Sequence, residues 1–157
     1  MAVSNLGKAE SHRIELLHGC NLDMLGRRDP AQYGTATLAQ LESEIVARGA
    51  TLGLEVRPFQ TNHEGALVEK IHDICQSAAG VIINPGAWTH YSYAIHDALE
   101  LVAGPVVEVH LSDINNREEW RRLSVISDVA QLTISGKGRE GYFEALEWLA
   151  RRLGPGR

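Results

Sequence analysis

Apolar residues along this 157-residue chain follow two repeating patterns. Short, mostly apolar runs predict buried strands at residues 13–18, 54–59, 80–84, 105–111 and 129–135. Between these runs, apolar residues recur every three or four positions, which is typical of amphipathic helices. Gly49 is expected to end the first helix. The helical positions are Leu38, Leu41 and Ile45; Leu67, Ile71 and Ile74; Ile95, Ala98 and Val102; and Tyr142, Leu146, Leu149 and Leu153.

Strands and helices alternate along most of the chain, with one extra loop before the last strand. Such alternation predicts a parallel sheet with helices on both faces, because parallel strands need crossover connections. Five strands fit a flavodoxin-like doubly wound sheet, an α/β/α arrangement of three layers. Residues 13–157 are therefore expected to form one domain after a flexible leader at residues 1–12. In such folds the ligand site lies beyond the carboxyl ends of the strands.

Composition and charge limit the kinds of partner. A net charge of −5 and a pI near 5.8 argue against nucleic acid, although a local site for a small anion is still possible. No apolar run approaches the roughly 18 residues of a membrane span, and the first residues are too polar for a secretory signal. Cys20 and Cys75 form no CxxC motif. We therefore expect a reduced, cytoplasmic protein with no membrane partner.

Familiar cofactor patterns do not account for this sequence. Residues 136–141 match GxGxxG, but the strand and the acidic residue that a dinucleotide site requires do not follow. A tight turn with close helix–strand packing is the favoured interpretation. HExxH and GxSxG are absent, and Glu108 and His110 have no third metal ligand at a recognisable spacing. We therefore expect neither a metal nor a cofactor.

The fourth predicted strand carries a carboxylate and an imidazole in an apolar setting. Glu108 and His110 are two apart, so their side chains should share one face of the strand. A buried unpaired charge is costly, so the two side chains are expected to interact. A carboxylate behind an imidazole fixes its tautomer and orients it as a general acid or base.

Polar residues after the third strand have two possible roles. Asn84 would either satisfy loop backbone groups, which is common, or bind substrate hydroxyls together with His90. Thr89 or His90 is expected to cap the following helix. The pattern alone leaves both interpretations open.

The segment RRDPAQYG, residues 27–34, favours an exposed turn that Asp-Pro opens and Gly34 closes. The alternative is an arginine held near Tyr33. A neighbouring guanidinium would lower the pKa of the phenol, which could then remove a carbon-bound proton.

Residues after the fourth strand could bind an anion. Backbone N–H groups beyond His110, with the Ser112 hydroxyl, could take a carboxylate or a phosphate. Arg117 and Arg121 are four apart and would share a face of a helical turn. Surface arginines usually mean only solvation, so this pattern alone decides nothing.

Four segments taken together resemble type II 3-dehydroquinate dehydratase, in the family's order and over residues 13–153. The first reads HGCNLDMLGRRDPAQYG, similar to the family's NGPNLNLLGxREPxxYG. The second reads FQTNHEGALVEKIH, similar to FQSNHEGxLIDxIH. The third reads INPGAWTHYSYAIHDAL, similar to INPGAYTHTSVAIRDAL. The fourth reads PVVEVHLSDINNREEWRRLSVIS, similar to PxVEVHLSNxxAREEFRxxSxxS. One motif would be suggestive, whereas four in order and register are specific.

The resemblance implies a hydro-lyase that converts 3-dehydroquinate to 3-dehydroshikimate by anti elimination through an enolate, without a Schiff base or a metal. It implies Tyr33 as the base, with Arg28 lowering the pKa of its phenol. It implies His110 as the acid, oriented by Glu108. Asn84 would hold substrate hydroxyls and a water that stabilises the enolate.

The resemblance also implies binding residues and an assembly. The family forms dodecamers built from trimers, so the chain is expected to be a homo-oligomer with a small-molecule substrate. The remaining implied roles are ring hydroxyl binding by His90 and Arg121, carboxylate binding by Leu111 and Ser112, support of the lid, which is the loop that carries Tyr33, by Asn21 and Arg117, and a contact from Asp97 to a neighbouring subunit's site.

The chain departs from the family pattern without losing an implied catalytic residue. The departures at His96, Asp113 and Leu123 leave open a paralogue that dehydrates a related cyclic hydroxy-ketoacid. A non-catalytic flavodoxin-like binding module is a further alternative, but binding alone needs no Glu–His pair, so the retained set of implied catalytic residues argues against it. The departures do not separate a biosynthetic role in the shikimate pathway from quinate catabolism. The substituted positions are His18 for Asn, Cys20 for Pro, Trp88 for Tyr, His96 for Arg, Asp113 for Asn, Asn116 for Ala, Trp120 for Phe, and Leu123 where His is common.

Overall fold

The computed structural model describes residues 12–154, so nearly all of the predicted leader at residues 1–12 lies outside the described residues. One parallel sheet has five strands in the order β2-β1-β3-β4-β5. This order is that of a flavodoxin-like doubly wound sheet, so the predicted fold class is confirmed. The strands are β1 (Arg13–His18), β2 (Glu55–Gln60), β3 (Gly80–Asn84), β4 (Val106–His110) and β5 (Leu132–Ser135).

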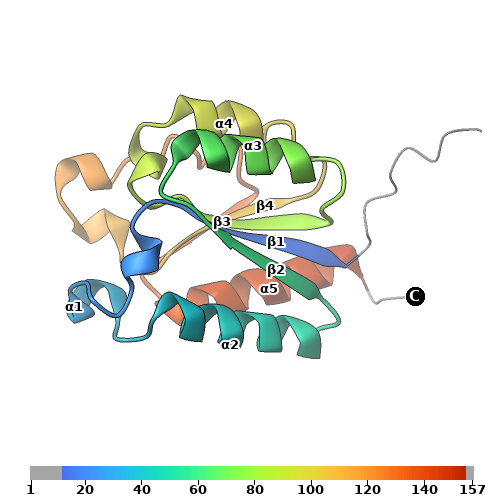
Figure 1. The fold of residues 1–157 in the computed structure, drawn as a ribbon, viewed down its shortest axis with the longest axis horizontal. Helices are drawn as coiled ribbons and strands as arrows, with labels where there is room; N and C mark the ends of the chain where they lie inside the picture. Colours follow the sequence, from blue (N-terminus) through green and yellow to red (C-terminus); the bar gives the residue numbers. More distant parts are fainter. Residues whose placement is uncertain (1–11, 155–157) are drawn as a thin grey trace, which may run out of the picture.

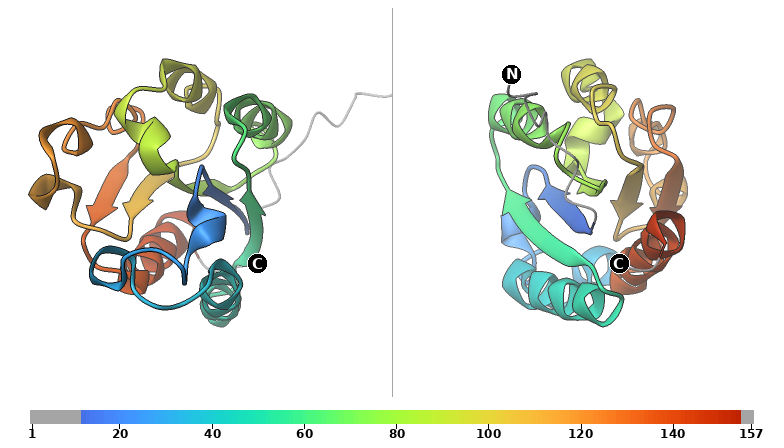
Figure 2. Two further views of the ribbon diagram at one scale, coloured as in Figure 1. Left: turned by 60° about the vertical axis from the view of Figure 1, so that its left-hand side comes forward. Right: turned by 90° about the vertical axis from the view of Figure 1, so that its right-hand side faces the viewer.

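Helices cover both faces of the sheet, as Figures 1 and 2 show. One face carries α2 (Leu38–Thr51) and α5 (Arg139–Leu153). The other face carries α3 (Glu64–Ile74) and α4 (Tyr93–Leu99). Each pair of helices buries its apolar stripe against the sheet and forms a separate core cluster. No helix in the described range is long and apolar enough to cross a membrane.

Alternation along the strands decides which face each polar side chain reaches. Val107 and Val109 pack in the cluster under α2 and α5, so Glu108 and His110 point to the opposite face, toward α4. On β3 the buried Ile82 belongs to the α2 and α5 cluster, so Asn84 points to that same side. The site residues on β4 and on β3 therefore receive support from opposite layers of the molecule.

Short helical turns gather at the carboxyl end of the sheet (Figure 1). The long connection after β1 is ordered as η1 (Leu22–Met24) and the one-turn helix α1 (Pro30–Tyr33). Asp29 begins α1 by accepting a hydrogen bond from the Ala31 N–H at 3.0 Å, and Gly34 ends it with a φ of 73°. The remaining turns are η2 (Gly86–His90), η3 (Ile114–Asn116) and η4 (Glu119–Arg121).

Four expected boundaries were wrong. Gly49 does not end α2 but lies inside it, where a side chain would collide with Val56 of β2. Ser92, rather than Thr89 or His90, caps α4 by accepting the Ile95 N–H at 3.1 Å, and Val102 lies beyond that helix. The last strand begins at Leu132 rather than at residue 129.

The GxGxxG segment forms a turn between β5 and α5. Gly136 and Gly138 have φ values of 78° and 55°, which only glycine adopts at little cost. Gly141 lies against Ile134 and Val109 of the sheet. This close helix–strand packing accounts for the glycines without a nucleotide.

Candidate active site

A pocket lies where β1, β3 and β4 end, at the position expected for this fold. Among its lining residues are most of the predicted site residues. Glu108 lies behind His110 rather than on the pocket wall, and Asp97 lies outside the pocket on α4. The predicted residues in the lining are Asn21, Arg28, Tyr33, Asn84, His90, His110, Leu111, Ser112, Arg117 and Arg121.

The structure brings the expected carboxylate and imidazole together. Nε2 of His110 lies 3.1 Å from Oε1 of Glu108. Glu108 is fully buried and His110 is 5% exposed. Because the carboxylate can only accept, Nε2 carries the hydrogen, and Nδ1 is the ring nitrogen left for other groups. Glu108 thereby fixes the tautomer and the orientation of His110.

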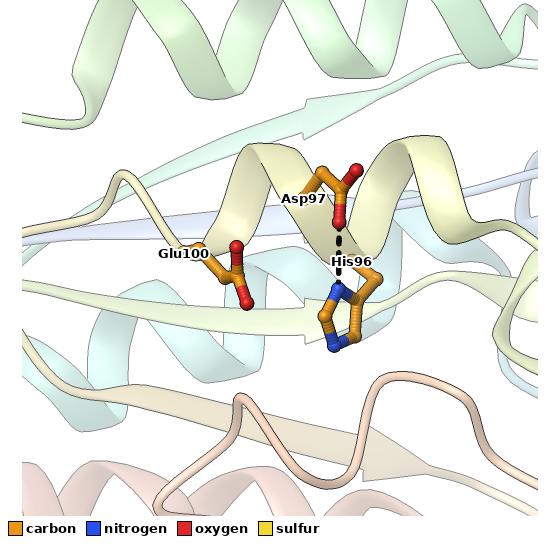
Figure 3. A group of neighbouring side chains, drawn as sticks. All are labelled: His96, Asp97 and Glu100. Atoms are coloured by element: carbon orange, nitrogen blue, oxygen red, sulfur yellow. Dashed lines mark hydrogen bonds and ion pairs between the residues drawn. The ribbon is translucent and has the colours of Figure 1, made fainter.

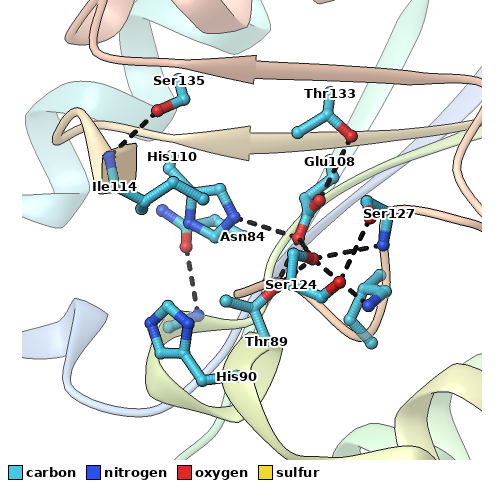
Figure 4. A network of polar contacts seen from close by, with 12 residues as sticks. Asn84, Thr89, His90, Glu108, His110, Ile114, Ser124, Ser127, Thr133 and Ser135 are labelled. Atoms are coloured by element: carbon cyan, nitrogen blue, oxygen red, sulfur yellow. Dashed lines mark hydrogen bonds and ion pairs between the residues drawn. The ribbon is translucent and has the colours of Figure 1, made fainter. Parts of the chain in front are cut away.

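Hydroxyl groups surround the buried carboxylate of Glu108 (Figure 4). Ser124 and Thr89 donate to Oε1, the former at 2.6 Å, and Thr133 donates to Oε2 at 3.2 Å. Burial alone would raise the pKa of Glu108, but the hydrogen bonds from His110, Ser124 and Thr89 outweigh it and hold that pKa below its ordinary value. Glu108 is thus kept ionised inside the protein, where its charge stabilises an imidazolium.

These hydroxyl donors were not identified as site residues in the sequence analysis. Thr89 was considered only as a helix cap, and neither Ser124 nor Thr133 was singled out as a site residue. Thr133 lies opposite Glu108 in the β4–β5 register, whereas Ser124 reaches it from a loop. The register of the neighbouring strands could have predicted the contact of Thr133 with Glu108. The contact of Ser124 depends on tertiary structure alone.

Tyr33 ends α1 and reaches the pocket between two arginines. The guanidinium carbon of Arg28 lies 3.7 Å from the centroid of the Tyr33 ring, a cation–π contact. Nη1 of Arg117 donates to the Tyr33 hydroxyl at 3.1 Å and to the Ser112 hydroxyl at 3.2 Å. Arg28 therefore lies over the ring, and Arg117 is the arginine that contacts the phenol oxygen. Both would stabilise negative charge on Tyr33.

His90 is suited to accept a hydrogen bond in the pocket. Its Nδ1 lies 2.5 Å from the carbonyl oxygen of Leu123, so Nδ1 carries the hydrogen. Burial lowers the pKa of His90, and the nearby His110 and Arg121 lower it further, although the hydrogen bond to Leu123 acts in the opposite direction. The neutral ring therefore keeps Nε2 as an acceptor, which fits a substrate hydroxyl.

Comparison with known proteins decides the family. The chain matches the family model described as "Dehydroquinase class II" over residues 12–150. It belongs to this family. The 3-dehydroquinate dehydratase of Pelobacter propionicus is 53% identical over 135 residues, which are 85% of this chain and 91% of that protein. The predicted family is therefore confirmed.

Two further similar proteins are a dehydroquinase with a solved structure and a protein named as a catabolic enzyme. The crystal structure of type II dehydroquinase from Propionibacterium acnes has a TM-score of 0.86 and 43% identity, covering 92% of this chain and 99% of that one. The catabolic 3-dehydroquinase of Verticillium alfalfae is 46% identical over 141 residues, which are 90% of this chain and 94% of that protein.

Two departures from the class II dehydroquinase pattern lie at or behind the pocket. Cys20 is part of the pocket lining. His18 is fully buried at the end of β1, and burial lowers its pKa to about 4. Its Nε2 lies 3.6 Å from Oε1 of Glu42, within reach of an ion pair. Because the ring is neutral near pH 7, this contact is not a salt bridge at that pH.

One group of side chains among the described residues is close enough to share a metal ion. It consists of His96, Asp97 and Glu100 on α4 (Figure 3) and lies outside the pocket. His96 instead forms ion pairs, with Nδ1 3.0 Å from Asp97 and Nε2 3.1 Å from Asp128. Exposed acidic groups of this kind are common without a metal, so the cluster does not indicate a metal centre.

Proposed function

We propose that this class II dehydroquinase dehydrates 3-dehydroquinate to 3-dehydroshikimate, with Tyr33 as the base and His110 as the acid. One observation carries the assignment. A phenol contacted by two arginines and an imidazole oriented by a buried carboxylate line the same pocket. A base and an acid on one pocket are what the removal of a proton and a hydroxide from adjacent carbons requires.

The first step uses the Tyr33 side of the pocket. As a phenolate, Tyr33 removes the proton α to the ketone, and the electron pair of the broken C–H bond forms an enolate. Arg117, which contacts the phenol oxygen, and Arg28, which lies over the ring, stabilise the phenolate before transfer. Asn84 lines the pocket and would hold the water that donates to the enolate oxygen.

The second step uses the His110 side. The enolate electrons form the carbon–carbon double bond, the C–O bond breaks, and His110 gives its proton to the departing hydroxide, so that water leaves. Glu108 stabilises the imidazolium that serves as the acid. General acid catalysis of this kind contributes about 10²–10⁴-fold to a rate.

The carboxylate of the substrate is proposed to lie against Leu111 and Ser112, with Arg121 and His90 at the ring hydroxyls. Arg117 and Asn21, both in the pocket lining, would support the closed site. The Ser112 hydroxyl accepts a hydrogen bond from Arg117, so a positive charge lies next to the residue proposed to bind the carboxylate. A charged donor of this type strengthens carboxylate binding.

Assembly into a dodecamer of trimers, with Asp97 reaching a neighbouring subunit's site, is part of the proposal. The Asp97 side chain is 77% exposed on α4. Large hydrophobic side chains that a subunit contact would cover are also exposed, among them Tyr91, Tyr93, Trp120 and Leu123. Light scattering of the purified chain tests the assembly, and a monomer with full activity would contradict it. The cytoplasmic location remains a prediction from the sequence.

Turnover of 3-dehydroquinate by the purified chain, followed by the enone absorbance of the product, tests the reaction. The same assay after exhaustive chelation tests the metal-free mechanism, for which we expect no loss of rate. A paralogue would turn over a related cyclic hydroxy-ketoacid but not 3-dehydroquinate, and a binding module would turn over neither. The comparisons favour neither alternative. Absence of turnover with 3-dehydroquinate would overturn the proposal.

A further inference from the structure

The side-chain amide of Asn84 is held at both ends by groups of the protein. Its Oδ1 accepts the backbone N–H of Gly86 at 3.1 Å. Its Nδ2 donates to the hydroxyl of Tyr142 at 3.1 Å. Asn84 is 4% exposed and Tyr142 is fully buried. The two contacts come from different parts of the chain, the turn after β3 and the first turn of α5.

Together the two contacts determine which way round the amide lies. The Gly86 N–H can only donate, so the oxygen of the amide must face it. The nitrogen then faces Tyr142, whose hydroxyl oxygen accepts one of the two Nδ2 hydrogens. The second Nδ2 hydrogen remains for a group in the pocket, which Asn84 lines.

Tyr142 itself does not line the pocket. It lies in the core cluster under α2 and α5, with its ring centroid 5.9 Å from that of His18. His18 is the β1 partner of Asn84 in the sheet register. Burial raises the pKa of Tyr142 and lowers that of His18, so both rings are uncharged near pH 7. Tyr142 therefore acts on Asn84 through one neutral hydrogen bond and adds no charge to the site.

We propose that Tyr142 is a positioning residue, whose hydroxyl fixes the Asn84 amide so that its second Nδ2 hydrogen faces the reacting substrate. The inference rests on the proposed function, because it takes the second Nδ2 hydrogen to form a hydrogen bond with the substrate or with the water at the enolate. Without the Tyr142 hydroxyl, one buried N–H loses its acceptor, and rotation of the amide no longer costs that hydrogen bond.

The Tyr142→Phe variant removes the hydroxyl and keeps the ring. We expect kcat to fall by about 5- to 100-fold, the range that corresponds to leaving one buried donor unpaired, while KM changes less. A control for packing is Leu146→Ala, one turn further along α5 in the same core cluster and without a polar contact. It should lower the melting temperature at least as much and leave kcat per folded site unchanged.

A double-mutant cycle with Asn84→Ala separates positioning from structure. If Tyr142 acts through Asn84, then Tyr142→Phe should cause no further loss of kcat once Asn84 is alanine. Losses that multiply in the double variant, or a Tyr142→Phe variant with the kcat of the wild type, would overturn the inference while leaving the proposed function intact. An inactive wild type would overturn the proposed function itself.

A measurement on the unaltered protein guards against a variant that does not fold. Hydrogen bonding at both ends of the amide predicts a side-chain signal of Asn84 in ¹H–¹⁵N spectra with one Nδ2 hydrogen protected from solvent exchange. The control is Asn62, an exposed amide that donates to Asp23. Equal, rapid exchange of both Asn84 hydrogens would overturn the inference.

Discussion

The two sides of the pocket are built in different ways. The acid side consists of β4, where Glu108 is fully buried and receives hydrogen bonds from one imidazole and three hydroxyls. The base side consists of the single turn α1, where the half-buried Tyr33 is held by one hydrogen bond from Arg117 and by the stacked Arg28. One side is part of the sheet, and the other is carried by a surface connection.

This difference matches the role proposed for each side. An acid that protonates a leaving hydroxide needs a fixed tautomer, which a buried carboxylate on the same strand supplies. A base on a connecting segment can be oriented by charged side chains and can move with the segment when substrate binds. Variants on the acid side should therefore change both stability and rate, whereas variants on the base side should change mainly the rate.

The largest expected effect is on the base side. Tyr33→Phe removes the phenol oxygen that is proposed to take the proton, so turnover should be abolished. The melting temperature and substrate affinity should stay close to those of the wild type, because the phenyl ring keeps its contact with Arg28. Calorimetric titration with substrate checks binding beside the rate assay. A near-normal kcat would place the base elsewhere.

The next effect is on the acid side. His110→Ala should lower kcat toward the upper end of about 10²–10⁴-fold, since hydroxide is a poor leaving group. Glu108→Gln should cost less and shift the pH–rate profile, because it keeps the shape but removes the charge that favours the imidazolium. Rate assays across pH beside melting curves measure both effects.

The two acid-side residues should also behave as one unit. The double variant should be far less than additive in kcat, because either change alone already removes the oriented acid. A purely structural pair would give another result, in which both single variants lose thermal stability and the surviving folded protein turns over normally.

A smaller effect separates the two arginines beside Tyr33. Arg117→Ala should reduce kcat by more than Arg28→Ala does, because Arg117 donates to the phenol oxygen whereas Arg28 contacts the ring face. Loss of one such charged hydrogen bond corresponds to roughly 10- to 150-fold. Steady-state kinetics of both variants, with Arg27→Ala as an exposed control on the same segment, measure the difference. Equal losses would show that hydrogen bonding to the oxygen is not what matters.

The sequence predicted different parts of the fold and the candidate site on the two sides of the pocket. The alternation of apolar segments predicted five parallel strands, and the spacing of Glu108 and His110 predicted their contact, because both depend on local periodicity. The motif resemblance placed Tyr33 and Asn84 in the site, where periodicity alone favoured a plain turn. Contacts made by single side chains across the fold were not predictable. Tyr142 has the spacing of a core residue, and nothing in that spacing reveals where its hydroxyl points.

The smallest expected effect concerns the support of the acid side. His96 links α4 to the loop that carries Ser124 through an ion pair to Asp128. It also forms an ion pair with Asp97 on its own helix. Hydrogen bonds to Asp97 and then to Asp128 raise the pKa of His96, and the charge of Glu100 adds to this. Its contribution to stability is therefore fully present below the unfolded-state pKa of about 6.5, and is lost as the pH rises through the higher folded-state value.

Melting curves between pH 5.5 and 9 of the wild type, His96→Arg and His96→Gln test this dependence. His96→Arg keeps the charge at every pH, so its advantage over the wild type should appear only on the alkaline side. His96→Gln should be less stable than the wild type on the acidic side and approach it on the alkaline side. Because both carboxylates are mostly exposed to solvent, the differences should be about 1–4 °C. Differences that do not vary with pH would mean that His96 contributes by packing rather than by charge.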